Sequence, residues 1–177
     1  MRYALVPHAH ASTAPLRGIT VDAIRPAPRA LALGFTATGD IAALRLPPLA
    51  APERADELWR HTCFEAFVQI GDGYYELNFA PSRQWAAYAF DDYRAGMRNA
   101  DVSGPQIVVS VADALLSLRA DVTLPPGAER MDWRLGLAAV IEDAHGEKNY
   151  WALAHPAGKP DFHHPNGFVG VLPSERT

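Results

Sequence analysis

Residues 58–90, LWRHTCFEAFVQIGDGYYELNFAPSRQWAAYAF, contain the clearest structural pattern in the chain. Apolar residues recur there at every second position, which is typical of half-buried β-strands. The apolar set is Phe64, Ala66, Val68 and Ile70 before a turn, and Tyr75, Leu77 and Phe79 after it. The stretch therefore predicts a β-hairpin, followed by a third strand at 85–90.

The turn of this hairpin is predicted at Gly71-Asp72. A two-residue type II′ turn needs a positive φ at its first position, which glycine accepts. The resulting register pairs Ile70 with Gly73, Val68 with Tyr75, Ala66 with Leu77 and Phe64 with Phe79, which places all apolar residues on one face. The other face pairs Glu65 with Asn78 and Phe67 with Glu76. A carboxylate beside an amide can bind polyols, or the two groups can bond each other; both interpretations stay open.

The remaining chain alternates short strand patterns with turn residues. Strands are expected at 3–7, 19–24, 31–36, 41–46, 107–111, 116–124, 133–141, 148–155 and 168–169, with a polar loop containing His8 and His10. Residues 53–58 are expected to form one helical turn, with Trp59 at its end. Some ten strands without helical periodicity predict an all-β fold, an antiparallel β-sandwich, with residues 1–177 as a single domain.

Composition and charge argue against several classes of function. The formal net charge is −4, 20% of residues are charged, and no long basic run occurs. Binding to nucleic acid or to a membrane surface is therefore not expected. The N-terminus lacks the apolar segment of a secretory signal and no 18-residue apolar stretch occurs, so the expected location is cytoplasmic. The oligomeric state and the pathway stay open.

Aromatic and polar residues suggest a ligand site. A sugar ring presents an apolar face that stacks on aromatic rings, while carboxylates, amides and arginine bond its hydroxyls. Trp85 and Trp151, with Glu65, Asn78 and Arg83 as polar neighbours, are candidates for such a site. The alternative is that these tryptophans fill the core of the sandwich.

The segment 155–165 concentrates ionisable residues between prolines. It carries His155, Lys159, Asp161, His163 and His164. These residues can form a hydrogen-bonded structural loop, one wall of a ligand pocket, or ligands of a transition metal. We expect the loop to close over one sheet, with Phe162 buried and with His163 or His164 hydrogen-bonded to the sheet or to a neighbouring carboxylate.

No motif for catalysis stands out. The chain contains no G-x-S-x-G, H-E-x-x-H or P-loop sequence. The single cysteine, Cys63, lies in a strand pattern and is expected to be buried, with His61 as its only nearby base. The expected function is non-catalytic, with an enzyme of unrecognised chemistry as an alternative. No cofactor is expected. Haem is the alternative, with Met97 or Met131 and a histidine as axial ligands.

Several of these residues also carry a family resemblance. Trp59, Glu65, the strand Phe67-Val68-Gln69-Ile70, the run Tyr74–Pro81, Trp85 and the segment 154–165 resemble bacterial DOMON-like domains, and the chain is similar to family 9 carbohydrate-binding modules. The resemblance covers about residues 5–172 and implies a β-sandwich that binds a sugar or haem. Those sugar-binding modules usually carry Asp three residues after the tryptophan, where this chain has Thr62.

The prediction is therefore a binding module for a carbohydrate or a similar polar small molecule. The candidate ligand-binding residues are Trp59, Glu65, Asn78, Arg83, Trp85, Trp151, His155, Lys159, Asp161, His163 and His164.

Overall fold

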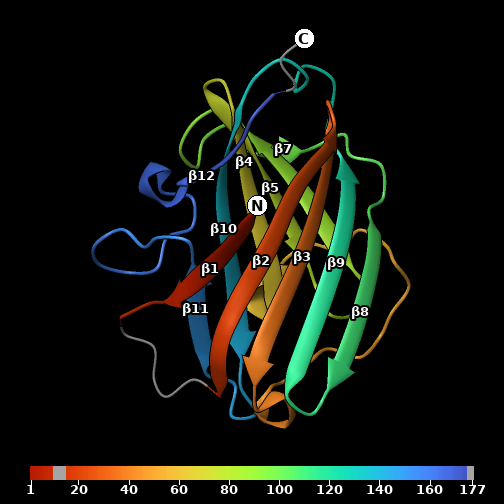
Figure 1. Cartoon of the computed structure of the whole chain (residues 1–177), viewed down its shortest axis with the longest axis vertical. Coiled ribbons are helices and arrows are strands. Elements are labelled where there is room, and N and C mark those ends of the chain that lie inside the picture. Colours follow the sequence, from red (N-terminus) through yellow and green to blue (C-terminus); the bar gives the residue numbers. More distant parts are fainter. Residues whose placement is uncertain (10–14, 175–177) are drawn as a thin grey trace.

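Within residues 1–9 and 15–174, which the computed structural model describes, the strands form one curled antiparallel sheet (Figure 1). They are β1 (Arg2–Pro7), β2 (Leu16–Ala27), β3 (Ala30–Gly39), β4 (Cys63–Ile70), β5 (Gly73–Phe79), β6 (Trp85–Phe90), β7 (Arg98–Asn99), β8 (Gln106–Ala112), β9 (Leu115–Thr123), β10 (Trp133–Glu142), β11 (Lys148–Ala152) and β12 (Gly170–Leu172). Their order is β7-β6-β5-β4-β10-β11-β1-β2-β3-β9-β8, and β12 pairs with β10 beside this path. Strand β1 joins the two halves, because it pairs with both β11 and β2.

The two halves of the sheet pack face to face and bury one main core between them. The half around β2, β3 and β9 contributes Ile19, Leu33, Phe35 and Leu118, and the half around β4, β5 and β10 contributes Phe64, Leu77 and Leu135. The rings of Phe35 and Phe64 meet across the interface with their centres 5.0 Å apart. This arrangement confirms the predicted antiparallel β-sandwich.

The hairpin of β4 and β5 has the predicted register. Phe64 pairs with Phe79, Ala66 with Leu77, Val68 with Tyr75 and Ile70 with Gly73. Of the two turn residues only Gly71 has a positive φ, +67°, as a type II′ turn requires. The inner face of the hairpin therefore enters the main core, and Glu65, Phe67, Glu76 and Asn78 lie on its outer face.

The other strand predictions are confirmed within a few residues, with two exceptions. Residues 41–46 do not form a strand, because Ile41–Ala43 is a 3₁₀ turn (η1) closed by the bond from Leu44 N to Ile41 O at 3.1 Å. The last strand is β12 and not 168–169. The side chain of Phe168 packs in a second apolar cluster, and the chain pairs with β10 only after this residue.

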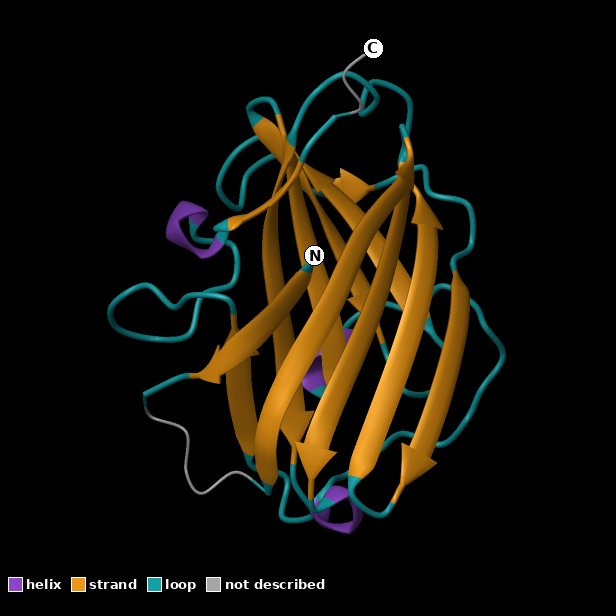
Figure 2. Cartoon of the chain, viewed as in Figure 1, coloured by secondary structure: helices purple, strands orange, loops and turns teal. Residues whose placement is uncertain are grey.

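The expected helical turn also lies further along the chain. It is a 3₁₀ turn at Leu58–Arg60 (η2), preceded by Glu57 in the left-handed region with φ 61°. His10 lies outside the described residues. No helix in the described part of the chain is long and apolar enough to cross a membrane, since all of them are short 3₁₀ turns (Figure 2).

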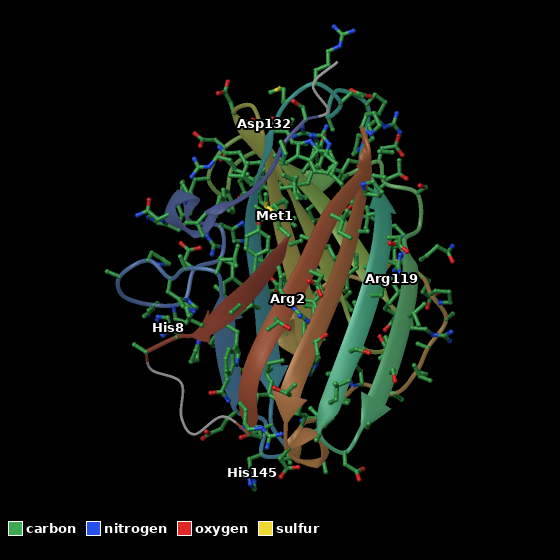
Figure 3. The ribbon with its side chains drawn as sticks, viewed as in Figure 1. Met1, Arg2, His8, Arg119, Asp132 and His145 are labelled. Carbon is green, nitrogen blue, oxygen red and sulfur yellow. The ribbon has the colours of Figure 1, made fainter. Side chains whose placement is uncertain are left out.

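The outward-facing surfaces of the two halves differ. On the half that contains β2 and β9, exposed ion pairs such as Arg2–Asp22 at 3.5 Å and Arg119–Asp121 at 3.2 Å face solvent (Figure 3). On the other half, loops cover the strands and bury a second cluster around Phe67, Tyr74, Phe90 and Phe168.

Gly136 on β10 makes room for that cover. A Cβ at this position would lie 2.6 Å from Cδ1 of Phe168, so a glycine is needed for the close approach. The rings of Phe67 and Phe168 stack with their centres 6.0 Å apart. The C-terminal segment is therefore anchored on the outer face of β4 and β10, where it bounds a pocket.

Candidate functional site

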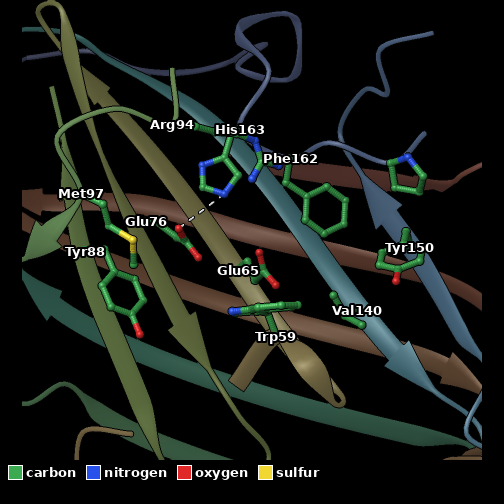
Figure 4. A pocket seen from close by; sticks show the side chains of 11 residues that line it. Trp59, Glu65, Glu76, Tyr88, Arg94, Met97, Val140, Tyr150, Phe162 and His163 are labelled. Atoms are coloured by element: carbon green, nitrogen blue, oxygen red, sulfur yellow. Dashed lines mark ion pairs between the residues drawn. The ribbon is translucent and has the colours of Figure 1, made fainter. Parts of the chain in front are cut away.

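The outer face of the β6-β5-β4-β10-β11 half holds a pocket of about 320 Å³, here called the outer-face pocket (Figure 4). Its floor comes from the strands, and its walls come from the turn at η2, the loop after β6 and the loop after β11. It is lined by Trp59, Glu65, Glu76, Tyr88, Arg94, Met97, Val140, Tyr150, Pro160, Phe162 and His163.

Two carboxylates lie at the floor of this pocket. The period-2 pattern directs Glu65 on β4 and Glu76 on β5 to the same face, between Trp59 and His163 (Figure 4). Glu65 is only 3% exposed, and its Oε1 is buried without a hydrogen-bond partner among the described residues. Glu76 Oε1 accepts a bond of 2.8 Å from Asn78 Nδ2. Asn78 Oδ1 is likewise buried and unbonded in the described structure, so acceptor atoms accumulate at this floor.

The environment disfavours negative charge on both carboxyl groups. Burial, and then the charge of Glu76, raises the pKa of Glu65 well above its ordinary value. Burial also raises the pKa of Glu76, against the opposing effects of the bond from Asn78 and the charge of Arg94. Both carboxyl groups therefore keep a proton to a higher pH than usual, and they can exchange hydrogen bonds with the hydroxyl or ammonium groups of a ligand.

His163 connects the covering loop to the floor. Its Nδ1 lies 2.8 Å from the hydroxyl of Tyr74 on β5, and its Nε2 lies 3.6 Å from Glu76 Oε2. The Tyr74 oxygen already accepts a bond of 3.2 Å from the backbone N–H of Arg94, so the hydroxyl is placed to donate to Nδ1. Burial, and then the charge of Arg94, lowers the pKa of His163 to about 4, so the ring is neutral at pH 7. The predicted hydrogen bond between this loop and the sheet is confirmed.

Asp161 ties the covering loop to the loop after β6. It accepts bonds from Tyr93 Oη at 2.6 Å, Arg94 Nη2 at 2.8 Å and the backbone N of His163 at 3.1 Å. Burial opposes ionisation of Asp161, but the bonds from Tyr93 and Arg94 outweigh it and hold the pKa below its ordinary value. Asp161 thus remains ionised, and its bonds to Tyr93, Arg94 and His163 hold the covering loop against the loop after β6.

Aromatic rings form the remaining walls. Trp59, 48% exposed, stands beside Glu65, while Tyr150 and Phe162 flank the other side (Figure 4). Tyr88 completes the set, and its hydroxyl donates a bond of 2.6 Å to Asp56. Phe162 is half-buried, so the prediction that this residue is buried holds only in part. Flat apolar rings above buried acceptors can hold a small ring-shaped ligand that is apolar on its faces and polar at its edge.

The structure brings together only part of the predicted site. Trp59, Glu65 and His163 line the outer-face pocket, Asn78 donates a hydrogen bond to Glu76 from the same strand, and Asp161 bonds the backbone N of His163 in the covering loop. Trp85 and Trp151 do not join them. Trp85 pairs with Phe79 and Trp151 with Ala139, so both point into the main core on the opposite face of the sheet.

The other predicted residues have different surroundings. Arg83 Nη2 donates to Ala50 O at 2.9 Å, outside the pocket. His155 Nε2 lies 3.0 Å from Val6 O, and the His164 side chain accepts a bond of 3.2 Å from Asn166 N. Lys159 lines an adjoining open depression of about 590 Å³, which also contains Arg94. Thr62 bonds Arg45 O and Glu142 N, at 2.9 and 3.1 Å, which is a structural role.

Sequence reasoning missed several lining residues as site residues. Glu76 has the same strand parity as Glu65, and that signal could have identified it. Tyr150 pairs with Val140 on β10, which in turn pairs with Cys63 on β4. Only this long-range strand order places these residues beside Glu65. Arg94 and Met97 lie on an irregular loop without any periodic pattern.

The residues at the pocket do not fit haem. Both ring nitrogens of His163 face protein groups, Tyr74 and Glu76. Met97 lies at the pocket, but Met131 lines a different depression near the hairpin turn. Within residues 1–9 and 15–174, no group of three or more His, Cys, Asp or Glu is arranged to hold a metal ion.

Cys63 and His61 do not form a reactive pair. Burial, and then the charge of Glu65, raises the pKa of the Cys63 thiol well above its ordinary value. His61 instead lies 2.7 Å from Glu142 Oε2 through its Nδ1. A thiol nucleophile is therefore not supported by this geometry.

Comparisons with known proteins support the fold. A proposed carbohydrate-binding protein from Bacteroides uniformis aligns with a TM-score of 0.70 and 15% identity, over 99% of this chain and 86% of the other. A family 9 carbohydrate-binding module from Caldicellulosiruptor kristjanssonii aligns in its glucose complex with a TM-score of 0.53 and 11% identity, over 98% and 85% of the chains. The cellotriose complex of a family 9 module from the same organism aligns with a TM-score of 0.57 and 10% identity, over 100% of this chain and 84% of the other.

The predicted similarity to family 9 modules is thus confirmed for the fold. No protein-family model and no curated protein matches the chain. The resemblance to DOMON-like domains stays a prediction.

Proposed function

We propose that this protein is a non-catalytic binding module for a carbohydrate or a similar polar small molecule, and that the outer-face pocket is its binding site. The fold supports this proposal, because the structural neighbours include a module in complex with glucose and in complex with cellotriose. The pocket of about 320 Å³ has the size of a site for a small ligand.

The observation that carries the proposal is the pairing of Trp59 with Glu65. The indole of Trp59 is half-exposed at the mouth, and Oε1 of Glu65 lies buried at the floor without a partner among residues 1–9 and 15–174. An unpaired buried acceptor costs about 1–3 kcal/mol, which a ligand hydroxyl would recover. A sugar ring can lay its C–H face on an aromatic ring while its hydroxyls reach Glu65 and Glu76.

The arrangement of the carboxylates favours binding over hydrolysis. A glycosidase places its two carboxyl groups on either side of the scissile bond. Glu65 and Glu76 instead lie at diagonal positions on adjacent strands of one floor, because Glu65 pairs with Asn78 and Phe67 with Glu76, and from there both can reach the same edge of a ligand. The proposal therefore assigns both groups to recognition.

Isothermal titration calorimetry against mono- and oligosaccharides, including glucose and cellotriose, tests the proposal. We expect at least one sugar to bind, and Trp59→Ala to weaken that binding about tenfold or more, equivalent to about 1.4 kcal/mol. Leu49→Ala is the matched control, because Leu49 is an exposed apolar residue outside the pocket. Failure of every sugar to bind the folded protein contradicts the proposal.

A further inference from the structure

The floor of the outer-face pocket carries acidic groups without a matching cation. Within the described residues, Glu65 forms no ion pair, and the only ion-pairing contact of Glu76 is with His163 at 3.6 Å. His163 is neutral at pH 7, because burial and the charge of Arg94 lower its pKa to about 4. Neither carboxylate therefore has a full positive charge as its partner.

The nearest arginines already have partners of their own. Arg94 donates to Asp161 at 2.8 Å, and that carboxylate offsets the charge of Arg94. Arg60, whose guanidinium lies 5.5 Å from the ring centre of Trp59, forms an ion pair of 2.7 Å with Glu57. Burial keeps the two carboxyl groups protonated to a higher pH than usual, and a cationic ligand would supply the positive charge that favours their ionised form.

The walls of the pocket also favour a cation. Aromatic rings attract ammonium groups at their faces, and Trp59, Tyr88, Tyr150 and Phe162 line one small space. A neutral sugar would use these rings for stacking alone. A sugar with an ammonium group would use the rings and both carboxylates through charge-assisted hydrogen bonds, which are the stronger kind.

From this charge balance we infer that the ligand of the outer-face pocket is an amino sugar, whose ammonium group is received by Glu65 and Glu76 between the aromatic walls. The inference rests on the proposed carbohydrate function and narrows its substrate class. It requires no covalent step. It also explains why two carboxyl groups are buried on adjacent strands of one floor where a single one would suffice for a hydroxyl.

An ammonium ligand makes the affinity of the outer-face pocket depend on pH. The bound ammonium favours ionised carboxylates, so binding releases protons and affinity rises with pH as the Glu65–Glu76 pair titrates. Affinity falls again when the amine of the ligand loses its proton. Among the described residues, the other titratable or charged groups around the pair are Cys63, Tyr74, Tyr88, Arg94, Tyr150, Asp161 and His163. The thiol and the phenols of Tyr74 and Tyr88 have raised pKa values and stay neutral across this range. The affinity for a neutral sugar should not show this decrease at high pH, because a neutral sugar has no amine to lose a proton.

Calorimetry with matched sugars tests the inference. The probes are glucosamine against glucose, galactosamine against galactose, and mannosamine against mannose, each titrated between pH 5.5 and 8.5. We expect at least one amino sugar to bind about tenfold or more tightly than its neutral parent near neutral pH, with a bell-shaped pH profile. Glu65→Gln should reduce this preference to about twofold or less. Asp72→Asn, which removes an exposed carboxylate at the hairpin turn, should leave it unchanged.

The outcomes separate the inference from the proposed function. Equal binding of amino and neutral sugars contradicts the inference and leaves carbohydrate binding in place. A preference for amino sugars that Glu65→Gln does not reduce also contradicts it. If tetramethylammonium binds as tightly as any amino sugar, the cation site is supported and the assignment of a carbohydrate ligand is contradicted. No binding of any probe to folded protein overturns both.

Discussion

The two faces of the β4–β5 hairpin are equally buried but differ in chemistry. On the inner face, Phe64, Leu77 and Phe79 are apolar and pack against the other half of the sheet. On the outer face, Glu65 and Glu76 are almost as inaccessible, yet Glu65 has an oxygen that no group in the described part of the chain bonds. The comparison teaches that burial alone does not distinguish core from site. The outer face is set apart by two buried carboxyl groups beside an open pocket.

The difference arises from what covers each face. The inner face meets a second sheet, whose side chains fill the space between them. The outer face is covered by loops that Phe168, His163 and Asp161 anchor at separate points. Loops held at a few points leave a space between them and the sheet, and this space is the outer-face pocket.

The largest expected effect is on the inner face. Phe64→Ala removes a fully buried ring from the main core and should lower the free energy of unfolding by about 3–5 kcal/mol. Denaturant melts measure this loss. At low temperature, the fraction that stays folded should bind ligand as the wild type does. A loss below about 1 kcal/mol would show that the two halves of the sheet pack loosely.

The loops should show an intermediate effect that depends on burial. Phe168→Ala removes a fully buried ring and should cost about 3 kcal/mol. Phe162→Ala removes a half-buried ring and should cost about 1 kcal/mol. The same denaturant melts compare the two variants directly. A larger loss for Phe162→Ala than for Phe168→Ala would reverse the assigned roles of anchor and wall.

The outer face should also make stability depend on pH. The pKa of Glu65 is raised in the folded state, so the folded protein retains a proton that the unfolded chain releases near pH 4.3, roughly the ordinary value for glutamate. The stabilising contribution is fully present below that pH and is lost as pH rises through the folded pKa.

Glu65→Gln isolates this effect. The lowered pKa of His163 acts in the opposite direction below its ordinary value, and comparison of the variant with the wild type cancels it. Thermal melts from pH 5 to pH 8 should show the wild type losing stability relative to Glu65→Gln as pH rises. Parallel profiles would mean that Glu65 is better solvated than its burial indicates.

The smallest expected effect on stability is at the mouth of the pocket. Trp59→Ala removes a half-exposed ring and should change the free energy of unfolding by about 0.5 kcal/mol or less. Trp85→Ala, the matched change on the inner face, should cost about 3 kcal/mol or more. Similar losses from the two variants would break the distinction between the faces.

The sequence was sufficient for the local geometry of the hairpin and not for the composition of the site. Alternation and one glycine determined the register, because both act between neighbouring residues. The prediction that Glu65 and Asn78 lie on the face opposite the main core was correct. The prediction that Trp85 and Trp151 join them at the site was wrong, because both pack in the main core. A strand pattern shows which residues share a side, but the partner sheet decides which side is the core. Tyr150 and Arg94 reach the pocket only through long-range strand order and loop packing, which no periodicity encodes.

The four tryptophans can report directly whether the ligand site lies on the outer face. Each indole N–H gives its own signal in a ¹H–¹⁵N correlation spectrum, and Trp85, Trp133 and Trp151 are buried in the main core while Trp59 is half-exposed. Titration with glucose, cellotriose and glucosamine should shift the Trp59 signal in a saturable way and leave the other three in place. A saturable shift of Trp85 or Trp151 with Trp59 unchanged would place the site on the inner face and contradict this account.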